Sequence, residues 1–172
     1  DVQAGKVNAF NLGLSPIVEP ELASLLAAAK TNGLLSATTD AAQAVLESEV
    51  SIVCVGTPAL ESGRLNLDFV RKVSQELRDA ISAKGTRHLV IYRCTMLPGS
   101  TRGLAKEFFA ELMHCGLVEV FYCPEFLREG TAVADFREPS LAALGLSEVA
   151  HESYEVVERL LGSGAERMSW ES

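Results

Sequence analysis

Apolar residues along the chain follow two alternating patterns. Continuous apolar runs, typical of strands buried on both faces, lie at 50–55, 88–94 and 118–122. Amphipathic segments with helical spacing lie at 3–12, 19–31, 41–48, 67–83, 101–114 and 148–161. Further short strands are predicted at 34–38, 141–144 and 166–170. Strands that alternate with helices predict an α/β fold with a doubly wound parallel sheet, covered on both faces and joined by right-handed crossovers.

Small polar residues follow the three longest apolar runs. Thr57 comes after the first run, Thr95 after the second and Glu125 after the third. If the runs are neighbouring parallel strands, these three residues share the carboxyl edge of the sheet, where ligands bind in open α/β folds. The sequence therefore predicts a functional site at this edge.

Two of these positions have both a structural and a functional interpretation. Pro124 is expected to open a short helix across 124–133, with Glu125 and Glu129 on one face of its first turn. Carboxylates there either complement the helix dipole or serve the site. Thr95 is either a strand-end hydroxyl before a capped helix or a group that holds an oxygen of a substrate or a water.

Length and charge narrow the class of protein. The 172 residues are the size of one domain, 1–172, and carry a net charge of -8 with no run of Lys or Arg. Nucleic acid is therefore not an expected partner. No apolar stretch reaches the roughly 18 residues that span a bilayer, and the first residues of the given sequence lack the basic region and apolar core that mark a signal peptide. We expect no membrane partner and a cytoplasmic location.

The cysteines and histidines do not form a recognisable metal or redox pattern. Four cysteines occur without a C-x-x-C pair, and the three histidines lie on separate predicted elements. We expect reduced thiols and no metal. Cys94 and Cys123 end apolar strands with no histidine nearby in sequence, which favours core packing over a nucleophilic role.

Five short segments resemble, in order and interval, the N-terminal domain of the UDP-glucose/GDP-mannose dehydrogenase family. They are Asp1 to Lys6, Ser15-Pro-Ile-Val-Glu-Pro20, Cys54-Val-Gly-Thr-Pro58, Cys94-Thr-Met-Leu-Pro-Gly-Ser100 and Pro124-Glu-Phe-Leu-Arg-Glu-Gly130. The resemblance implies a Rossmann-like, NAD-binding domain. It also implies an oxidoreductase that uses NAD to oxidise the C6 hydroxyl of a nucleotide sugar twice, giving a uronic acid.

The resemblance assigns the cofactor contacts. Asp1 would accept hydrogen bonds from the adenosine ribose hydroxyls, which favours NAD over NADP, and Lys6 would lie near that part of the cofactor. Thr57, Thr95 and Glu129 would also contact NAD. The family's G-x-G-x-x-G turn and first strand would precede Asp1, so the sheet is expected to lack both.

The resemblance also assigns the catalytic roles. Thr95 would position a water beside the reacting carbon, and Glu125 would be the acid/base that hydrolyses a thioester intermediate. The family's nucleophilic cysteine, in a G-G-x-C-x-P-K-D segment, would follow Ser172. We therefore expect this chain to be an interior fragment that is inactive and poorly soluble alone, and the full-length enzyme to be a homodimer.

The substrate expected from the resemblance is GDP-mannose. The Leu97-Pro-Gly99 turn and the 15–20 loop are closer to the GDP-mannose branch, which implies GDP-mannuronate for alginate-type polysaccharide biosynthesis. UDP-glucose is the alternative. Two other classes stay open: a binding module with a partial Rossmann fold and no catalysis, or an unrelated doubly wound protein in which Thr57, Thr95 and Glu125 lie on different faces.

Overall fold

The computed structural model describes residues 1–147, 153–161 and 165–169. The chain divides into two compact units. Unit 1 contains Asp1–Ala44 and Phe126–Ser140, and unit 2 contains Val45–Glu125 and Leu141–Ser172. No helix in the described ranges is long and apolar enough to cross a membrane.

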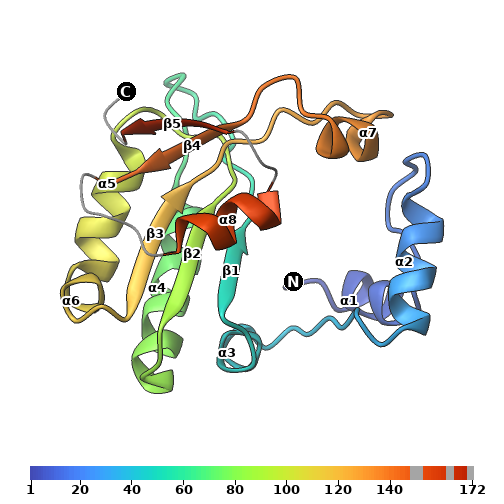
Figure 1. The fold of residues 1–172 in the computed structure, drawn as a ribbon, viewed down its shortest axis with the longest axis horizontal. Coiled ribbons are helices and arrows are strands. Elements are labelled where there is room, and N and C mark those ends of the chain that lie inside the picture. Colours follow the sequence, from blue (N-terminus) through green and yellow to red (C-terminus); the bar gives the residue numbers. More distant parts are fainter. Residues whose placement is uncertain (148–152, 162–164, 170–172) are drawn as a thin grey trace. The chain divides into compact units, whose positions relative to one another are not determined.

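Unit 2 contains a five-stranded sheet (Figure 1). Its strands, in spatial and chain order, are β1 Val50–Val53, β2 His88–Tyr92, β3 Val118–Tyr122, β4 Ala143–Leu146 and β5 Glu166–Ser169. The pairs β1–β2, β2–β3 and β4–β5 are parallel, as predicted. The α/β prediction is therefore confirmed for most of the sheet.

The prediction of a wholly parallel sheet is wrong at β4. This strand pairs antiparallel with β3, with Tyr122 opposite Gly145. A parallel neighbour requires a crossover that carries the chain back along the sheet. The connection Phe126–Ser140 belongs to unit 1 instead. The chain thus rejoins the sheet at the end where β3 finishes, and β4 runs back alongside it.

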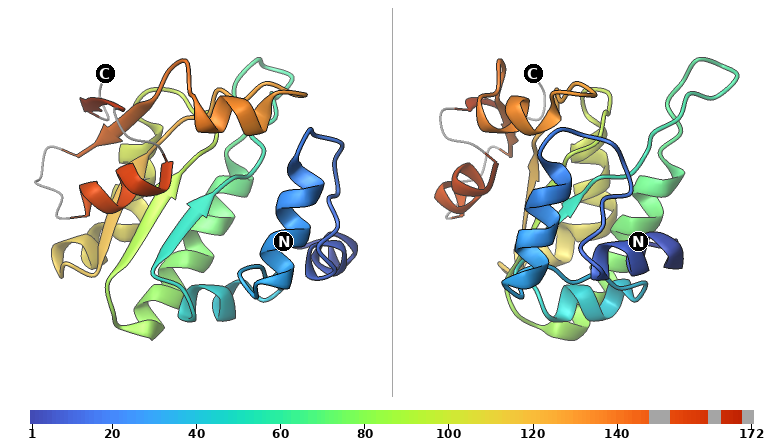
Figure 2. Two further views of the ribbon diagram at one scale, coloured as in Figure 1. Left: turned by 45° about the vertical axis from the view of Figure 1, so that its right-hand side comes forward. Right: turned by 90° about the vertical axis from the view of Figure 1, so that its right-hand side faces the viewer.

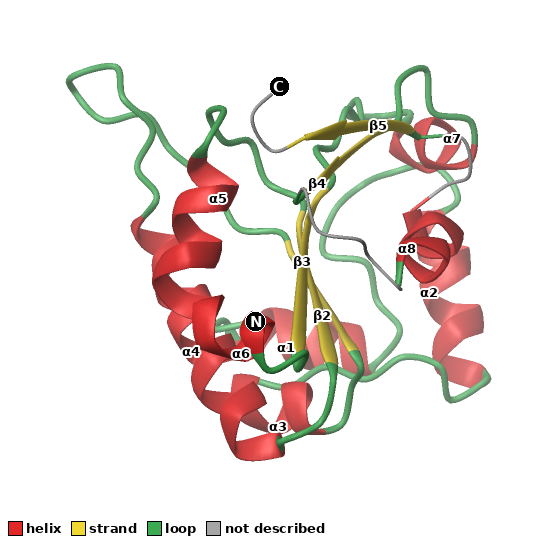
Figure 3. Ribbon diagram, turned by 60° about the vertical axis from the view of Figure 1, so that its left-hand side comes forward, coloured by secondary structure: helices red, strands yellow, loops and turns green. Residues whose placement is uncertain are grey.

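Helices cover both faces of the sheet in unit 2. Figure 3 shows α4 (Asp68–Lys84), α5 (Ser100–Leu104) and α6 (Ala110–His114) on one face and α8 (Tyr154–Leu161) on the other. A π-helical segment, η1 (Ala105–Phe109), joins α5 to α6, so the predicted helix at 101–114 is one helical stretch with altered winding.

Each face of the sheet has its own apolar cluster. All five residues of β2 are buried, and they alternate between the faces because successive strand side chains point in opposite directions. Val90 and Tyr92 pack with α4 and the α5–α6 stretch. Leu89 and Ile91 pack with Phe121 and α8. Burial on both faces explains why this run is continuously apolar.

Unit 1 is built from helices and loops (Figure 2). Its helices are α1 Ala4–Asn11, α2 Leu22–Thr31, α7 Ala132–Arg137 and α3 Ala41–Leu46, whose last two residues belong to unit 2. Gly13, with φ +73°, follows α1 and lies directly against α2. A Cβ there would be 3.1 Å from the Lys30 Cβ and 3.4 Å from the Ala27 Cα, so this position requires glycine.

The strand predicted at 34–38 is not formed. The Asn11 side chain binds this segment instead, because Asn11 Nδ2 donates to the Ala37 carbonyl at 2.9 Å and Asn11 Oδ1 accepts the Ala37 N–H at 2.8 Å. A side-chain amide thus makes the two hydrogen bonds that a neighbouring strand would make. The prediction of a strand here is therefore wrong, and the segment is held by a side chain instead.

Candidate functional site

The carboxyl ends of β1, β2 and β3 lie along one edge of the sheet in unit 2. The ladder continues one residue past the strands: the Arg93 N–H donates to the Val53 carbonyl and the Cys123 N–H to the Tyr92 carbonyl, both at 2.9 Å. The loops that carry Thr57, Thr95 and Glu125 therefore leave the sheet at a common edge. The prediction of a shared edge is confirmed.

Two of the predicted site residues are joined directly. Thr57 Oγ1 donates a hydrogen bond to the Thr95 carbonyl at 2.8 Å, although the residues are 38 positions apart. The bond ties the loop after β1 to the loop after β2. Thr95 is exposed, so its own hydroxyl is available at the surface of this edge.

Glu125 is placed near the same edge by its effect on Cys54. Desolvation raises the pKa of the Cys54 thiol, the positive charge of Arg93 lowers it, and the negative charge of Glu125 raises it. Both charges therefore act on the residue that directly follows β1. The edge combines two threonines with a cation and an exposed carboxylate, which is an arrangement that can orient a polar ligand and move a proton.

Two of the cysteines at this edge, Cys94 and Cys123, are packing residues. Burial is the main cause that raises the pKa of Cys94, to about 11, and burial also raises the pKa of Cys123. Both are buried and free, and the Arg93 Nη1–H donates to Cys123 Sγ at 3.4 Å. Thiols held in the protonated form are poor nucleophiles. The prediction of reduced, core-packed cysteines is confirmed for this pair.

The predicted helix at Pro124 is wrong. Residues 124–128 are irregular, and α7 begins only at Ala132. Asp135 accounts for the difference, because its carboxylate accepts the Arg128 backbone N–H at 3.0 Å and binds the guanidinium and the Thr131 hydroxyl. Hydrogen bonds to the Asp135 side chain stabilise this loop, in place of the backbone hydrogen bonds of a helix. Glu125 and Glu129 therefore do not share a helical face, and they belong to different units.

The remaining predicted cofactor residues lie in unit 1. Asp1 is exposed, and its Oδ1 accepts the Gln3 N–H at 2.8 Å, which holds the carboxylate at the start of α1. Lys6 is exposed on α1 itself, and Glu129 is exposed in the loop before α7. The structure thus assigns three predicted residues to each unit.

Two residues near the predicted sites were not identified from the sequence. Arg93 directly follows β2, so its position at the end of a predicted strand could have indicated a residue at the ligand-binding edge of the sheet. Glu19 accepts backbone hydrogen bonds from Gly130 and Ala132, more than 100 positions away. The sequence indicates Glu19 less clearly, because it shows only a carboxylate in a loop with prolines on either side, at positions 16 and 20.

No group of side chains suited to a metal ion occurs within residues 1–147, 153–161 and 165–169. A cavity of about 100 Å³ lies in unit 2 beside β3 and β4, lined by residues that include Met96, Leu97, Tyr122 and Met168. This volume corresponds to a few water molecules. It is therefore not a compartment for a dinucleotide.

Comparison with known proteins identifies relatives of the whole described fold. The model of the UDP-glucose/GDP-mannose dehydrogenase family, NAD binding domain, matches residues 1–162. GDP-mannose 6-dehydrogenase of Pseudomonas aeruginosa is 40% identical over 84% of this chain and 34% of its own length. UDP-glucose 6-dehydrogenase of Rhizobium meliloti is 33% identical over 85% of this chain and 33% of its own length.

Solved structures show the same relationship. A ternary complex of GDP-mannose dehydrogenase from Pseudomonas aeruginosa aligns with a TM-score of 0.85 and 36% identity, covering 99% of this chain and 40% of that protein. A UDP-glucose dehydrogenase from Pyrobaculum islandicum aligns with a TM-score of 0.88 and 31% identity over the same shares. The chain spans about a third of the length of the curated relatives it matches. It belongs to the UDP-glucose/GDP-mannose dehydrogenase family and corresponds to the NAD binding domain of that family.

Proposed function

We propose that this chain is the NAD-binding part of a nucleotide-sugar 6-dehydrogenase that oxidises the C6 hydroxyl of GDP-mannose to the carboxylate of GDP-mannuronate. The supporting structural observation is the edge of unit 2, where Thr57 binds the Thr95 carbonyl and the charge of Glu125 acts on the adjacent Cys54. An unrelated protein with chance motif matches would not be expected to gather these residues at one edge.

The residues present suit NAD. Asp1 offers an exposed carboxylate for ribose hydroxyls, and Lys6 offers an exposed cation in the first turn of α1. Polar groups on partly or fully exposed loops are offered by Thr57, Thr95 and Glu129. When bound, NAD supplies the oxidising power, taking two electrons in each of two successive oxidations. A carboxylate at the ribose disfavours NADP, since its 2′-phosphate would meet a like charge.

The protein residues at the edge of unit 2 handle the water and its proton. In the proposed hydrolysis of the thioester intermediate, the exposed Thr95 hydroxyl orients a water. The Glu125 carboxylate accepts a proton from that water as it attacks. Burial holds the Cys94 and Cys123 thiols protonated at this edge, so the nucleophile is proposed to be a cysteine elsewhere in the full-length enzyme.

The choice of GDP-mannose rests on similarity. GDP-mannose 6-dehydrogenases of Pseudomonas aeruginosa and Azotobacter vinelandii are 40% and 39% identical to this chain, compared with 33% for the Rhizobium meliloti UDP-glucose enzyme. UDP-glucose is the second candidate, because a UDP-glucose dehydrogenase gives a TM-score of 0.88.

The proposal also covers the domain organisation, the location and the oligomeric state of the enzyme. We propose that units 1 and 2 together form one NAD-binding domain, which is supported by a family match that spans both. A cytoplasmic location agrees with the use of NAD and a nucleotide sugar. A homodimer of the full-length enzyme is also proposed.

NADH formation by the full-length protein tests the function. We expect turnover with GDP-mannose and a much lower kcat/KM with UDP-glucose. Glu125→Gln should lower kcat by about 10²–10⁴-fold, the range for losing a general base, and a sugar adduct should accumulate on the enzyme in mass spectra. Glu61→Gln, in an exposed loop of the same unit, is the matched control and should turn over normally.

The alternatives give distinct results. Preference for UDP-glucose would keep the enzyme class but change the substrate. Absence of NADH formation with either sugar, while the protein is folded and pure, would contradict the proposed function and favour a binding module.

A further inference from the structure

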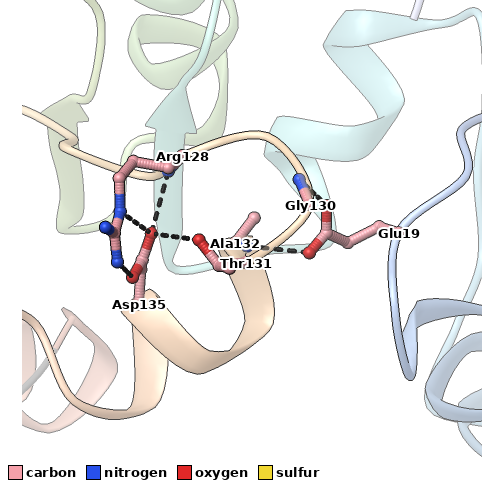
Figure 4. A network of polar contacts seen from close by, with 6 residues as sticks. All are labelled: Glu19, Arg128, Gly130, Thr131, Ala132 and Asp135. Atoms are coloured by element: carbon pink, nitrogen blue, oxygen red, sulfur yellow. Dashed lines mark hydrogen bonds and ion pairs between the residues drawn. The ribbon is translucent and has the colours of Figure 1, made fainter.

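The carboxylate of Glu19 holds the loop before α7 through its backbone. Glu19 Oε2 accepts the Gly130 N–H at 2.8 Å, and Oε1 accepts the Ala132 N–H at 2.7 Å (Figure 4). Both oxygens are thus engaged by one short stretch of chain, within unit 1. Hydrogen bonds to an ionised carboxylate are shorter and stronger than neutral ones. Glu19 is therefore a fixed anchor for this loop.

The anchored stretch is a tight turn with Glu129 at its corner. The Thr131 N–H donates to the Arg128 carbonyl at 3.1 Å, and Gly130, the third residue of the turn, has φ +84°. This φ is typical of the third position of a type II turn, where glycine is favoured. Glu129 is the second residue, so the direction of its side chain depends on the conformation of the turn.

The turn is held from both ends. On one side, Asp135 accepts the Arg128 backbone N–H at 3.0 Å and binds the guanidinium at 2.7 Å (Figure 4). On the other side, Glu19 accepts the N–H groups of Gly130 and Ala132, which come after Glu129. The backbone before and after Glu129 is therefore restrained while its side chain stays exposed.

The loop that carries Glu19 is itself constrained. Ser15 Oγ donates to the Ile17 carbonyl at 2.6 Å. Glu21 has φ +65°, the only positive φ of a residue other than glycine in the described chain. Such a conformation is costly and persists only where its surroundings hold it. An ion pair between Glu21 Oε2 and Arg137 Nη1, at 2.8 Å, joins this loop to the end of α7.

We propose that Glu19 is a positioning residue for the cofactor contact made by Glu129. It touches neither NAD nor sugar, but it fixes the turn that presents Glu129 and so removes the cost of ordering that turn when NAD binds. This proposal rests on the proposed function, because Glu129 is assigned to NAD there.

Kinetics of the full-length protein test the role. Glu19→Gln removes the charge and one acceptor, so KM for NAD should rise about tenfold, as expected when charge-assisted hydrogen bonds are lost. At saturating NAD the turn is ordered again, so kcat and KM for the sugar should change less than about twofold. Glu138→Gln, at the exposed residue that follows α7, is the matched control, and its KM for NAD should stay within about twofold of wild type.

A double variant separates positioning from general stability. If Glu19 acts through Glu129, then Glu19→Gln should have little further effect on KM for NAD once Glu129 is replaced by Ala. Additive effects of Glu19→Gln and Glu129→Ala would overturn the proposal, as would an unchanged KM for NAD in Glu19→Gln.

Amide hydrogen exchange gives a readout that does not depend on turnover. The Gly130 and Ala132 amides should exchange about tenfold faster or more in Glu19→Gln, and at the wild-type rate in Glu138→Gln. Equal exchange in wild type and Glu19→Gln would overturn the positioning role. Absence of NADH formation in the wild-type protein would instead contradict the proposed function.

Discussion

All five residues of β2 in unit 2 are buried, whereas α2 in unit 1 buries none of its ten residues. Unit 2 has an apolar cluster on each face of its sheet. Unit 1 leaves large apolar side chains exposed, including Val18 at 100% and Leu34 at 81%, and its loops are joined by the carboxylates of Glu19, Glu21 and Asp135. Apolar burial organises unit 2, and polar contacts organise the loops of unit 1.

The difference has a functional consequence. Burial of apolar area is non-directional and gives a rigid scaffold, on which strand ends can present Thr57 and Thr95 at fixed positions. Hydrogen bonds to carboxylates are directional, so they can set the conformation of one turn and with it the direction of one side chain. The predictions below test this contrast, and they run from the largest expected effect to the smallest.

The largest effect is expected from the sheet of unit 2. Phe121 is fully buried, so Phe121→Ala should lower the free energy of unfolding by about 3–5 kcal/mol, measured by urea denaturation. Leu25→Ala in α2, where the side chain is 43% exposed, should cost less than about 1 kcal/mol. Equal losses would show that unit 1 also depends on an apolar core.

A titratable group inside unit 2 gives the next effect. His88 is buried, hydrogen-bonded to Ser51 at 2.8 Å and close to Lys84. Burial, and then the charge of Lys84, lowers the pKa of His88 from 6.5 to about 4. The neutral form is favoured in the folded state, so unfolding takes up a proton between these two values. The free energy of unfolding should fall by at most about 3 kcal/mol as the pH drops from 6.5 to 4.

A substitution tests whether His88 causes this pH dependence of the free energy of unfolding. His88→Asn should remove the part of the pH dependence that lies between 4 and 6.5, as measured by urea denaturation across this range. His114→Asn, at an exposed position on α6, is the control and should leave it in place. Persistence of the slope in His88→Asn would assign it to carboxylates.

A polar contact in unit 1 should have a local effect. Hydrogen bonds from Arg128 hold the pKa of the Asp135 carboxyl well below its usual range, so it is ionised at neutral pH. Asp135→Asn should therefore speed amide exchange at Arg128 by about tenfold while the urea midpoint stays unchanged. A shift of the midpoint would show that this loop contributes to the global stability of the protein.

The smallest effect is expected from a polar contact on the surface of unit 2. Arg71 pairs with Glu107, and their side chains are 49% and 43% exposed. Solvent screens such a pair, so Glu107→Gln should change the free energy of unfolding by less than about 1 kcal/mol, and less at high salt. A larger loss would mean that ion pairs are as important in unit 2 as they are in the loops of unit 1.

Local patterns in the sequence were sufficient for the scaffold and for one edge of the site. The continuous apolar runs predicted β1, β2 and β3. The expected burial on both faces holds for β2, whose five residues are all buried, but it is wrong for β1, which lies at the edge of the sheet and leaves Ile52 43% exposed. The edge with Thr57, Thr95 and Glu125 followed from those strands being parallel neighbours. The five motifs predicted the family, which the comparisons confirm.

Other features were decided only by the tertiary structure. The antiparallel entry of β4, the binding of Ala37 by Asn11 and the hold of Glu19 on Gly130 each join residues far apart in the chain. A periodic pattern reports which face of an element is buried, but not which distant polar group will satisfy a free backbone N–H. The sequence by itself thus determined the three parallel strands β1, β2 and β3 and the family, and long-range hydrogen bonding determined how the turn with Glu129 is held.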